Sequence, residues 1–371
     1  MKMKFSKRAM AMVAVTSVLA LGACGAPEQN VGRESTDGGM PSNVNLTVPY
    51  SAGGGTDTWA RFLSPYLEQY VEGNPRFLVE NVPGGESVTG SNAFVNTGGT
   101  SGETILVTSG TTYLQALLGQ PEVQFDFSEM RPLMLNGTGG VAYVSSKTGI
   151  ESVADLADYD ATLTYGGISA TGLDVTLLQA MDVLDIDIDA TFGFEGRGPA
   201  RLALERGEVN LDYQTTSAYL TQVEPMVEEG TAVPLFSFGV IEDGEVVRDP
   251  AFPDLPTLEE AYELIHGGSP EGPAYEAYRA FLVPAYVYQK GIWANAGTPD
   301  EVVDAYRESV REIVEDEEFL SSSEDILGGY PLVAGDVAEE ELRKSFQIPE
   351  EIRNYTLDML ENEHGVTIRS K

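Results

Sequence analysis

The hydrophobic positions of this chain follow two spacings in turn, the two-residue period of β-strands and the longer period of amphipathic helices. Val44, Leu46 and Val48 alternate with polar residues and predict a strand. Beyond a glycine turn, apolar residues recur at helical spacing on one face and predict a helix; they are Trp59, Phe62, Leu63, Tyr66, Leu67 and Tyr70. Segments of both kinds continue to alternate along the chain, which favours an α/β architecture.

Two later helices are predicted from the residues at their ends. Pro199 suits the first position of one helix, and Gly207 is expected to end it. Thr298 lies three residues before Glu301, which is the spacing of a helix cap. We therefore predict a helix over residues 299–314 that is capped by the Thr298 side chain.

The first 24 residues have the composition of an export signal. A basic start precedes an apolar run over residues 9–20, which is shorter than the roughly 20 residues of a membrane span. The run closes on Leu-Gly-Ala-Cys24, which resembles a lipobox, whose cysteine is lipidated and becomes the mature N-terminus. The alternative is a plain secretory signal with an unrelated cysteine. Cys24 is the only cysteine, so an intramolecular disulfide is impossible.

The residues after the signal divide into a tether and a long globular part. Residues 25–43 are small, polar and turn-rich without periodicity, and they predict a flexible tether between lipid and domain. Residues 44–371 are long enough to form two globular lobes.

The turn between the first strand and the first helix carries the strongest candidate chemistry. Gly53, Gly54 and Gly55 have no side chains, so an anion can approach their backbone closely. The first amide groups of the following helix are unpaired, and the helix dipole adds partial positive charge there. The sequence therefore predicts a carboxylate or phosphate site, with an ordinary strand-to-helix connection as the alternative. The segment lacks the ending of a nucleotide-binding P-loop and the spacing of a dinucleotide fingerprint.

The same segment resembles the first motif of the solute receptors of tripartite tricarboxylate transporters, the Bug-type extracytoplasmic binding proteins. The matching residues are Pro49, Tyr50, Ala52, Gly53, Gly54, Asp57, Ala60 and Arg61. Further landmarks of that family are similar to residues 162–167, 192–200 and 291–299. The resemblance spans roughly residues 44–335.

The resemblance implies a type II periplasmic-binding-protein fold, in which two α/β lobes share crossover strands and hold the ligand in the cleft between them. We place the first lobe at residues 44–138 and 236–371, and the second lobe at residues 139–235. The implied protein is not an enzyme and has no cofactor or metal. It is a lipid-anchored, extracytoplasmic monomer that passes a small di- or tricarboxylate to a permease of one large and one small membrane protein.

In this interpretation one ligand carboxylate accepts hydrogen bonds from the first turn, neighbouring turns supply hydroxyl donors, and the second lobe closes over the distal end. The predicted ligand-binding residues are Tyr50, Ala52, Gly53, Gly54, Thr56, Asp57, Gly84, Gly85, Ser109, Thr111, Gly166, Gly167, Ser169, Arg197 and Thr215. Asp57 is expected to cap the helix or tie the loop. Arg197 is either a bidentate clamp on the anion or a solvent-exposed side chain. Tyr50, Tyr165 and Phe194 either wall the cleft or pack in the core.

The chain departs from the family pattern at three places. Glu86 interrupts the second glycine motif, where it would repel an anion, pair with a ligand amine or face solvent, and we expect it to face solvent. Residues 168–172 lack the histidine of the second-lobe pattern, and Glu195 stands where the family often has lysine. The second-lobe contacts, and with them the ligand, are therefore expected to differ.

Composition excludes several functions. The chain has 58 acidic and 22 basic residues, a net charge of −36, whereas nucleic-acid binding needs a basic surface. Its acids are scattered, and no nucleophile elbow, Cys/His pair or zinc spacing appears. An exported enzyme is therefore the weakest interpretation. The alternative to transport is a receptor of the same fold that passes ligand occupancy to a sensor kinase.

The charge excess predicts that thermal stability rises with salt. Uncompensated negative charges repel one another within a folded chain, and salt screens that repulsion. The melting temperature should climb between dilute buffer and molar sodium chloride. A flat or falling curve would contradict the charge argument.

Overall fold

A computed structural model describes residues 39–242 and 244–368 of the chain. The predicted export signal at residues 1–24, its Cys24 and most of the predicted tether lie outside these residues. Within the described part, no helix combines the length and the hydropathy needed to cross a bilayer.

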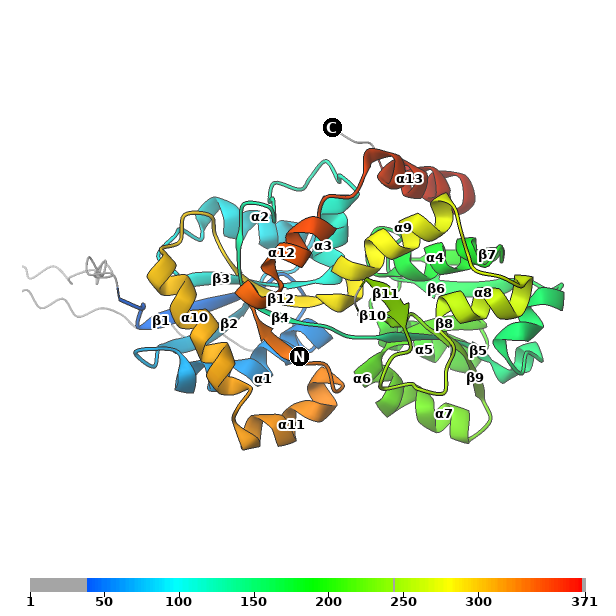
Figure 1. The fold of residues 1–371 in the computed structure, drawn as a ribbon, viewed down its shortest axis with the longest axis horizontal. Helices are drawn as coiled ribbons and strands as arrows, with labels where there is room; N and C mark the ends of the chain where they lie inside the picture. The colour runs from blue at the N-terminus through cyan, green and yellow to red at the C-terminus, as the bar shows by residue number, and fades with distance from the viewer. Residues whose placement is uncertain (1–38, 243, 369–371) are drawn as a thin grey trace, which may run out of the picture. The chain divides into compact units, whose positions relative to one another are not determined.

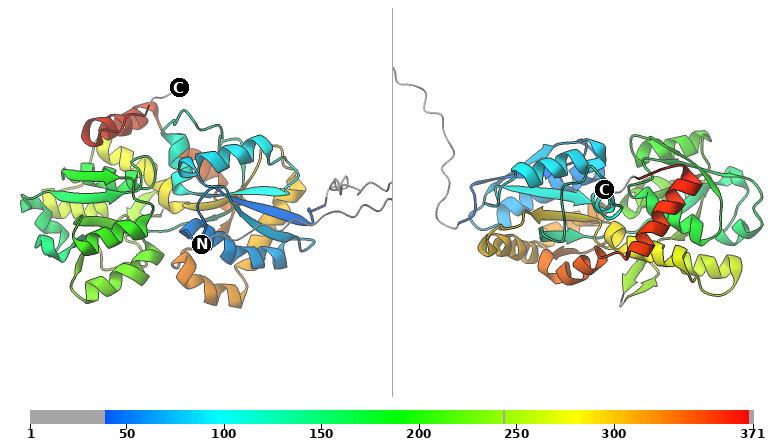
Figure 2. Two further views of the ribbon diagram at one scale, coloured as in Figure 1. Left: turned by 180° about the vertical axis from the view of Figure 1, so that it is seen from behind. Right: turned by 90° about the horizontal axis from the view of Figure 1, so that it is seen from above.

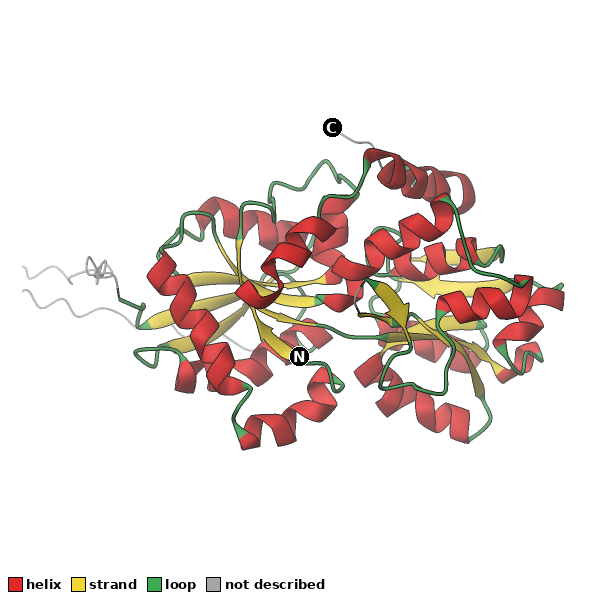
Figure 3. Cartoon of the chain, viewed as in Figure 1, coloured by secondary structure: helices red, strands yellow, loops and turns green. Residues whose placement is uncertain are grey.

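The described residues form two separate mixed sheets, which confirms the two-lobed α/β architecture (Figures 1 and 3). The first sheet has the strand order β13-β4-β12-β3-β1-β2. Its strands are β1 (Asn43–Val48), β2 (Arg76–Asn81), β3 (Thr104–Ser109), β4 (Arg131–Asn136), β12 (Lys290–Ala294) and β13 (Leu332–Ala334). β1 pairs in parallel with β2 and β3, while β12 runs antiparallel between β3 and β4.

The second sheet has the strand order β7-β6-β8-β5-β9. Its strands are β5 (Gly140–Ser145), β6 (Leu163–Gly167), β7 (Ile188–Phe192), β8 (Leu211–Thr215) and β9 (Ala232–Ser237). β6 pairs in parallel with β7 and β8, and β5 runs antiparallel between β8 and β9. A short hairpin of β10 (Val240–Glu242) and β11 (Glu245–Val247) follows.

Helices cover both faces of the first sheet. One face packs against α1 (Gly55–Tyr70), α10 (Asp300–Ile313) and α11 (Glu317–Leu327). The other face packs against α2 (Val88–Thr97), α3 (Gly110–Leu117) and α12 (Gly335–Ser345). Trp59, Leu63 and Leu67 of α1 are buried in the first of these cores, which confirms the helix face predicted from their spacing.

The second sheet is covered by its own helices. These are α4 (Asp174–Val183), α5 (Arg197–Arg206), α6 (Thr216–Ala218), α7 (Glu224–Glu228), α8 (Leu258–His266), α9 (Pro273–Leu282) and α13 (Glu350–His364). Short 3₁₀ and π segments complete the chain: η1 (Gly85–Ser87), η2 (Ser146–Thr148), η3 (Val153–Asp158), η4 (Tyr219–Val223) and η5 (Val283–Val287).

The C-terminal part corrects the predicted lobe division. Residues 236–371 were assigned to the first lobe, yet α8, α9 and α13 pack into the core of the second sheet through Leu258, Phe281 and Leu360. Figure 2 shows α13 against the helices of the second lobe. The prediction was wrong there because an apolar helix face shows that a helix is buried but not which sheet buries it.

The predicted helix ends are partly corrected. Gly207 ends α5 with a left-handed φ of 80°, as predicted, but the helix begins at Arg197, so Pro199 is its third residue. α10 begins at Asp300. Thr298 does not cap it, because its hydroxyl donates to the carbonyl of Asn295 at 2.8 Å.

The two lobes are joined by crossover segments that lie against each other. Residues 137–139 connect β4 to β5, and the chain returns from η5 to β12. The amide of Thr138 donates to the carbonyl of Tyr286 at 2.9 Å. A Cβ on Gly137 would lie 2.7 Å from the carbonyl oxygen of Val287, so only glycine fits at this contact.

Candidate functional site

The loops that follow the parallel strands of both sheets form the candidate site. β1, β2, β3 and β4 all end at the edge of the first sheet that leads into the crossover, because β3 and β4 are both antiparallel to β12. β6, β7 and β8 end at the facing edge of the second sheet, where Thr215 lies opposite Gly140. In open α/β sheets, ligands bind at the carboxyl ends of the strands.

The first turn presents an accessible backbone. Ala52, Gly53, Gly54 and Gly55 are exposed, and α1 begins directly after them. Its first three amide groups, at residues 55–57, have no intrahelical acceptor, since the amide of Thr58 is the first to find one, the Gly54 carbonyl at 2.9 Å. These amides can serve as donors to an anion.

Asp57 ties this turn together. Its Oδ2 accepts from the Gly53 amide at 2.8 Å and from Arg61 Nε at 3.0 Å, and its Oδ1 accepts from Asn81 at 2.9 Å. Burial alone would raise the pKa of Asp57, but these hydrogen bonds hold the pKa below its ordinary value. Asp57 is therefore a loop anchor, which confirms the expectation that it ties the loop.

A hydroxyl cluster lies beside the first turn. The Tyr50 hydroxyl is 2.7 Å from Ser109 Oγ and 2.6 Å from Thr112 Oγ1. Ser109 is the N-cap residue of α3, and Thr111 follows in its first turn. The structure thus brings Tyr50, Ser109 and Thr112 together, although they come from two loops about 60 residues apart in the sequence. Thr111 lies against the second lobe instead, where a Cβ on Gly172 would be 3.2 Å from its Cγ2.

Glu86 points toward the second lobe, so the prediction that it faces solvent is wrong. The side chain is half-buried, and its Oε2 accepts from Gln115 Nε2 at 3.0 Å. Gln115 also donates to Thr171 Oγ1 of the second lobe at 3.3 Å. Burial raises the pKa of Glu86, Ser169 and Gln115 lower it by hydrogen bonding, and the Asp174 charge raises it.

The backbone at this point is strained. Gly84 and Gly85 adopt φ values of 138° and 53°, and the next two residues, Glu86 and Ser87, also have positive φ, at 51° and 94°. Non-glycine residues rarely adopt this conformation, which costs of order 1–3 kcal/mol each. It is this strained segment that carries the Glu86 side chain, whose carboxylate points across the lobe junction.

Aromatic rings fill the space that a side chain would occupy at Gly166 and Gly167, the predicted second-lobe glycines, so a ligand cannot enter there. A Cβ on Gly166 would lie 2.9 Å from the Phe194 ring, and one on Gly167 would lie 2.5 Å from Phe192. Ser169 does reach the lobe junction, because its side chain hydrogen-bonds to the Glu86 carboxylate of the first lobe. Thr215 lies at the end of β8 beside the crossover.

Arg197 takes neither of its two predicted roles. Its side chain is 15% exposed, and it binds two buried carboxylates, Asp174 at 2.7 Å and Asp212. It also donates to Tyr165 Oη at 2.8 Å and lies over the Tyr213 ring, 4.4 Å from the ring centre. The guanidinium is therefore paired inside the second lobe and is not a free clamp for a ligand anion.

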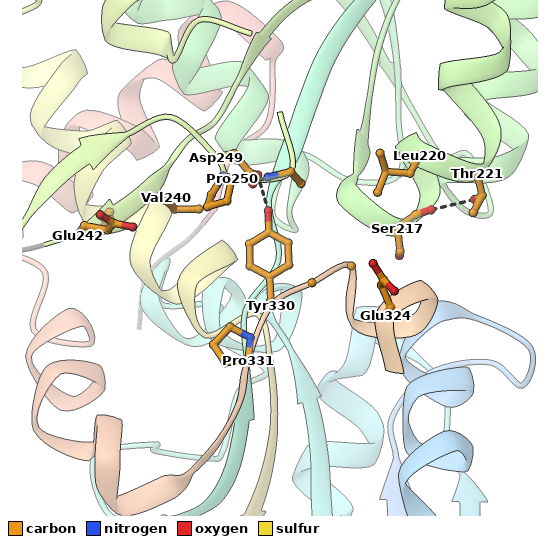
Figure 4. Close-up of a pocket in the computed structure, with 14 residues that line it drawn as sticks. Ser217, Leu220, Thr221, Val240, Glu242, Asp249, Pro250, Glu324, Tyr330 and Pro331 are labelled. Carbon is orange, nitrogen blue, oxygen red and sulfur yellow. Dashed lines mark hydrogen bonds between the residues drawn. The ribbon is translucent and has the colours of Figure 1, made fainter. Parts of the chain in front are cut away.

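A cavity of about 620 Å³ opens at another part of the lobe junction (Figure 4). Ser217, Leu220 and Thr221 line it from the second lobe, and Glu324 and Tyr330 line it from the first. Figure 4 shows the Tyr330 hydroxyl directed at Asp249, with which it hydrogen-bonds.

The charge of this cavity argues against a carboxylate. The residues that line it include Glu242, Asp249 and Glu324, and among these lining residues there is no lysine or arginine. An anion would be repelled there. At the other end of the same edge the first turn and the hydroxyl cluster offer hydrogen-bond donors, Asp57 is paired with Arg61, and the pKa of Glu86 is raised by burial.

Sequence reasoning missed three residues at this edge, which are Gln115, Thr171 and Lys290. Gln115 and Thr171 form one of the polar contacts between the lobes. Lys290 is the first residue of β12 and lies opposite Ser109 on one side and Asn136 on the other. The sequence offered one indication of Lys290, because this residue directly precedes the tryptophan-containing strand at residues 291–293.

Comparison with solved structures shows the fold. The periplasmic binding protein BugD matches with a TM-score of 0.61 at 17% identity, over 89% of this chain and 99% of its own. Rpa4515 of R. palustris, solved with adipate, has a TM-score of 0.61 at 20% identity, over 85% and 97% of the two chains. MatC (Rpa3494) from Rhodopseudomonas palustris, solved with malate, has a TM-score of 0.59 at 19% identity, over 84% and 98%.

The chain therefore has the two-lobed fold of periplasmic solute-binding proteins. No protein-family model and no curated protein matches its sequence.

Proposed function

We propose that this chain is an extracytoplasmic solute-binding protein that captures a small carboxylate for a tripartite tricarboxylate-type transporter. One observation carries the proposal. Three loops rich in hydrogen-bond donors, at residues 50–57, 109–112 and 168–172, adjoin at one edge of a fold shared with proteins solved with adipate and malate. Backbone amides at a helix start and positioned hydroxyls are suited to a carboxylate group.

The two-lobed arrangement supports a ligand with carboxylates at two ends. The first turn and the hydroxyl cluster of the first lobe would hold one carboxylate. The second lobe would contact the distal part through the loop that contains Ser169, and it would thereby select among di- and tricarboxylates. In this role the loaded protein delivers its ligand to a permease of one large and one small membrane protein.

A thermal-shift screen of acetate, succinate, malate, adipate and citrate in high salt tests the proposed function. A ligand at about 100 times its Kd stabilises the folded state by about 2.7 kcal/mol, which raises the melting temperature measurably. A hit is then titrated by calorimetry, with the corresponding neutral diamide as the control. Binding of the diamide as tightly as the acid, or no binding of any carboxylate, contradicts the proposal. Recovery of the acid unchanged separates binding from turnover.

The proposed lipid anchor has its own test at Cys24. Replacing this cysteine with serine removes the acceptor thiol, so the Cys24→Ser protein should be released from the membrane or remain unprocessed. Fractionation of cells, with mass spectrometry of the mature N-terminus, measures both outcomes. Normal processing and full membrane retention of the variant would refute the lipobox interpretation.

A further inference from the structure

Lys290 is a half-buried cation without a carboxylate partner among the described residues. Its Nζ donates to the side-chain oxygen of its neighbour Gln289 at 2.5 Å. By contrast, Arg197 and Arg307, whose side chains are 15% and 9% exposed, are paired with carboxylates. A desolvated ammonium without a counter-charge is costly, so its presence calls for a reason.

The strand register places Lys290 on the same side of the sheet as the first turn. Lys290 lies directly opposite Ser109, and two residues further on Ile292 lies opposite Val107. Directly opposed residues of antiparallel strands project to one face, and the faces alternate along each strand. Ile292 and Val107 are buried in the core beneath α1, so Lys290 and Ser109 project to the α1 face as well.

Lys290 also lies at the edge of the sheet where the candidate loops begin. Ser109, its partner on β3, hydrogen-bonds to the hydroxyl of Tyr50, which enters the first turn. Asn136, its partner on β4, donates to the Tyr330 and Pro331 carbonyls at 3.2 Å. Lys290 therefore stands between the donor-rich loops and the acidic cavity.

We infer that Lys290 supplies the positive charge that binds the ligand carboxylate, beside the neutral donors of the first turn and of Ser109. The inference rests on the proposed function. In a chain with a net charge of −36, amide and hydroxyl donors work against a repulsive overall field. An ammonium that the protein leaves unpaired offsets that field locally, and a bound carboxylate in turn removes the cost of the unpaired charge.

The neighbours of Lys290 make its titration simple. Ser109 on β3 and Asn136 on β4 do not titrate. On α1 the Asp57 carboxylate is paired with the arginine one turn later at 3.0 Å. Burial raises the pKa of Tyr50, which keeps that hydroxyl neutral. Burial also lowers the pKa of Lys290 to about 8, so the ammonium is protonated at pH 7 and is lost above pH 8.

The test compares wild type with Lys290→Met, using as the probe whichever acid of the screen binds wild type. At pH 7 the variant should bind this acid about 10- to 100-fold more weakly than wild type does. Wild-type affinity should fall as the pH rises from 7 to 9, and the residual affinity of the variant should not change with pH. Lys147→Met removes the same charge from an exposed site and should leave affinity within about twofold.

A second measurement needs no ligand. The Lys290 pKa is lower in the folded than in the unfolded state, so this group destabilises the fold below pH 8, and the penalty fades as pH rises toward its unfolded value. Lys290→Met should therefore raise the melting temperature at pH 7 by about 2–4 °C, with the difference shrinking by pH 10. If Lys290 instead stabilised the fold, the methionine variant would have a lower melting temperature than wild type.

The outcomes separate the inference from the proposed function. If wild type binds no carboxylate, both fail. If wild type binds and Lys290→Met binds equally well, or wild-type affinity is independent of pH between 7 and 9, the Lys290 assignment alone fails. A lower melting temperature for the methionine variant also overturns the assignment. If the variant does not fold, the pH dependence of wild-type binding decides.

Discussion

Replacing Arg197 with methionine is expected to lower the free energy of unfolding by about 3–5 kcal/mol. The guanidinium stands between the carboxylates of Asp174 and Asp212, whose side chains are 2% and 1% exposed. Removal of the arginine leaves two buried negative charges without their partner, and burial of an uncompensated charge is strongly unfavourable. Urea denaturation followed by circular dichroism measures the loss.

Arg206→Met is the matched control for this prediction. Arg206 lies on the same helix, is 62% exposed and pairs with Glu208 at 3.6 Å, an exposed contact worth about 0–1 kcal/mol. Adding Asp174→Asn and Asp212→Asn to the Arg197 variant should recover part of the loss, because the unpaired charges disappear. A decrease of less than about 1 kcal/mol for Arg197→Met would contradict the buried ion-pair assignment.

Replacing Gly54 with valine is expected to abolish carboxylate binding while the fold is retained. Gly54 has an extended backbone, with φ of −76° and ψ of 167°, a conformation that β-branched residues favour. A Cβ at this position meets only the Ser51 carbonyl oxygen, at 3.3 Å. The branched side chain would stand beside the free amides of α1, where the anion is proposed to sit.

The expected loss follows from the hydrogen bonds that become impossible. Each charge-assisted bond is worth about 1.5–3 kcal/mol, so losing two reduces affinity by at least about 100-fold. Calorimetric titration measures the affinity, and the melting temperature checks the fold. Gly54→Ala, with a single methyl group, should lose less. A folded Gly54→Val protein with native affinity would disprove the placement of the anion at this turn.

At Gly53, the neighbouring residue, it is the backbone conformation that requires glycine. Gly53 has φ of 81°, which disfavours any side chain, whereas Gly54 does not need glycine for its backbone conformation. A substitution at Gly53 would therefore mix backbone strain with loss of binding. Gly54 gives the cleaner test, because its variant affects the site and not the turn.

The local elements could be predicted from the sequence because their causes are local. Alternating apolar residues define β1, helical spacing defines the buried face of α1, and the intervening glycines define the turn. Gly207 ends α5 for the same reason, since a left-handed residue is needed there. The α/β class and the two-lobed fold followed from the order of such elements together with the family resemblance.

The tertiary structure alone decided which groups meet. Arg197 finds Asp174 and Asp212 at separations of 23 and 15 residues, Glu86 finds Gln115 at 29, and Tyr50 finds Ser109 at 59. A charge in a loop has the same sequence signature whether it faces solvent, a ligand or a buried partner. Only the packing of the strands decides among these environments.

The same limit explains the lobe borders and Lys290. The apolar face of α9 indicates that this helix is buried, but the sheet against which it packs depends on the path of the whole chain. Lys290 became a candidate only through its register opposite Ser109, a residue 181 positions earlier in the chain (290 − 109). Sequence by itself determined the strand, the turn and the helix of the first loop. The tertiary structure decided which charges remain unpaired beside it, because that depends on contacts between distant segments.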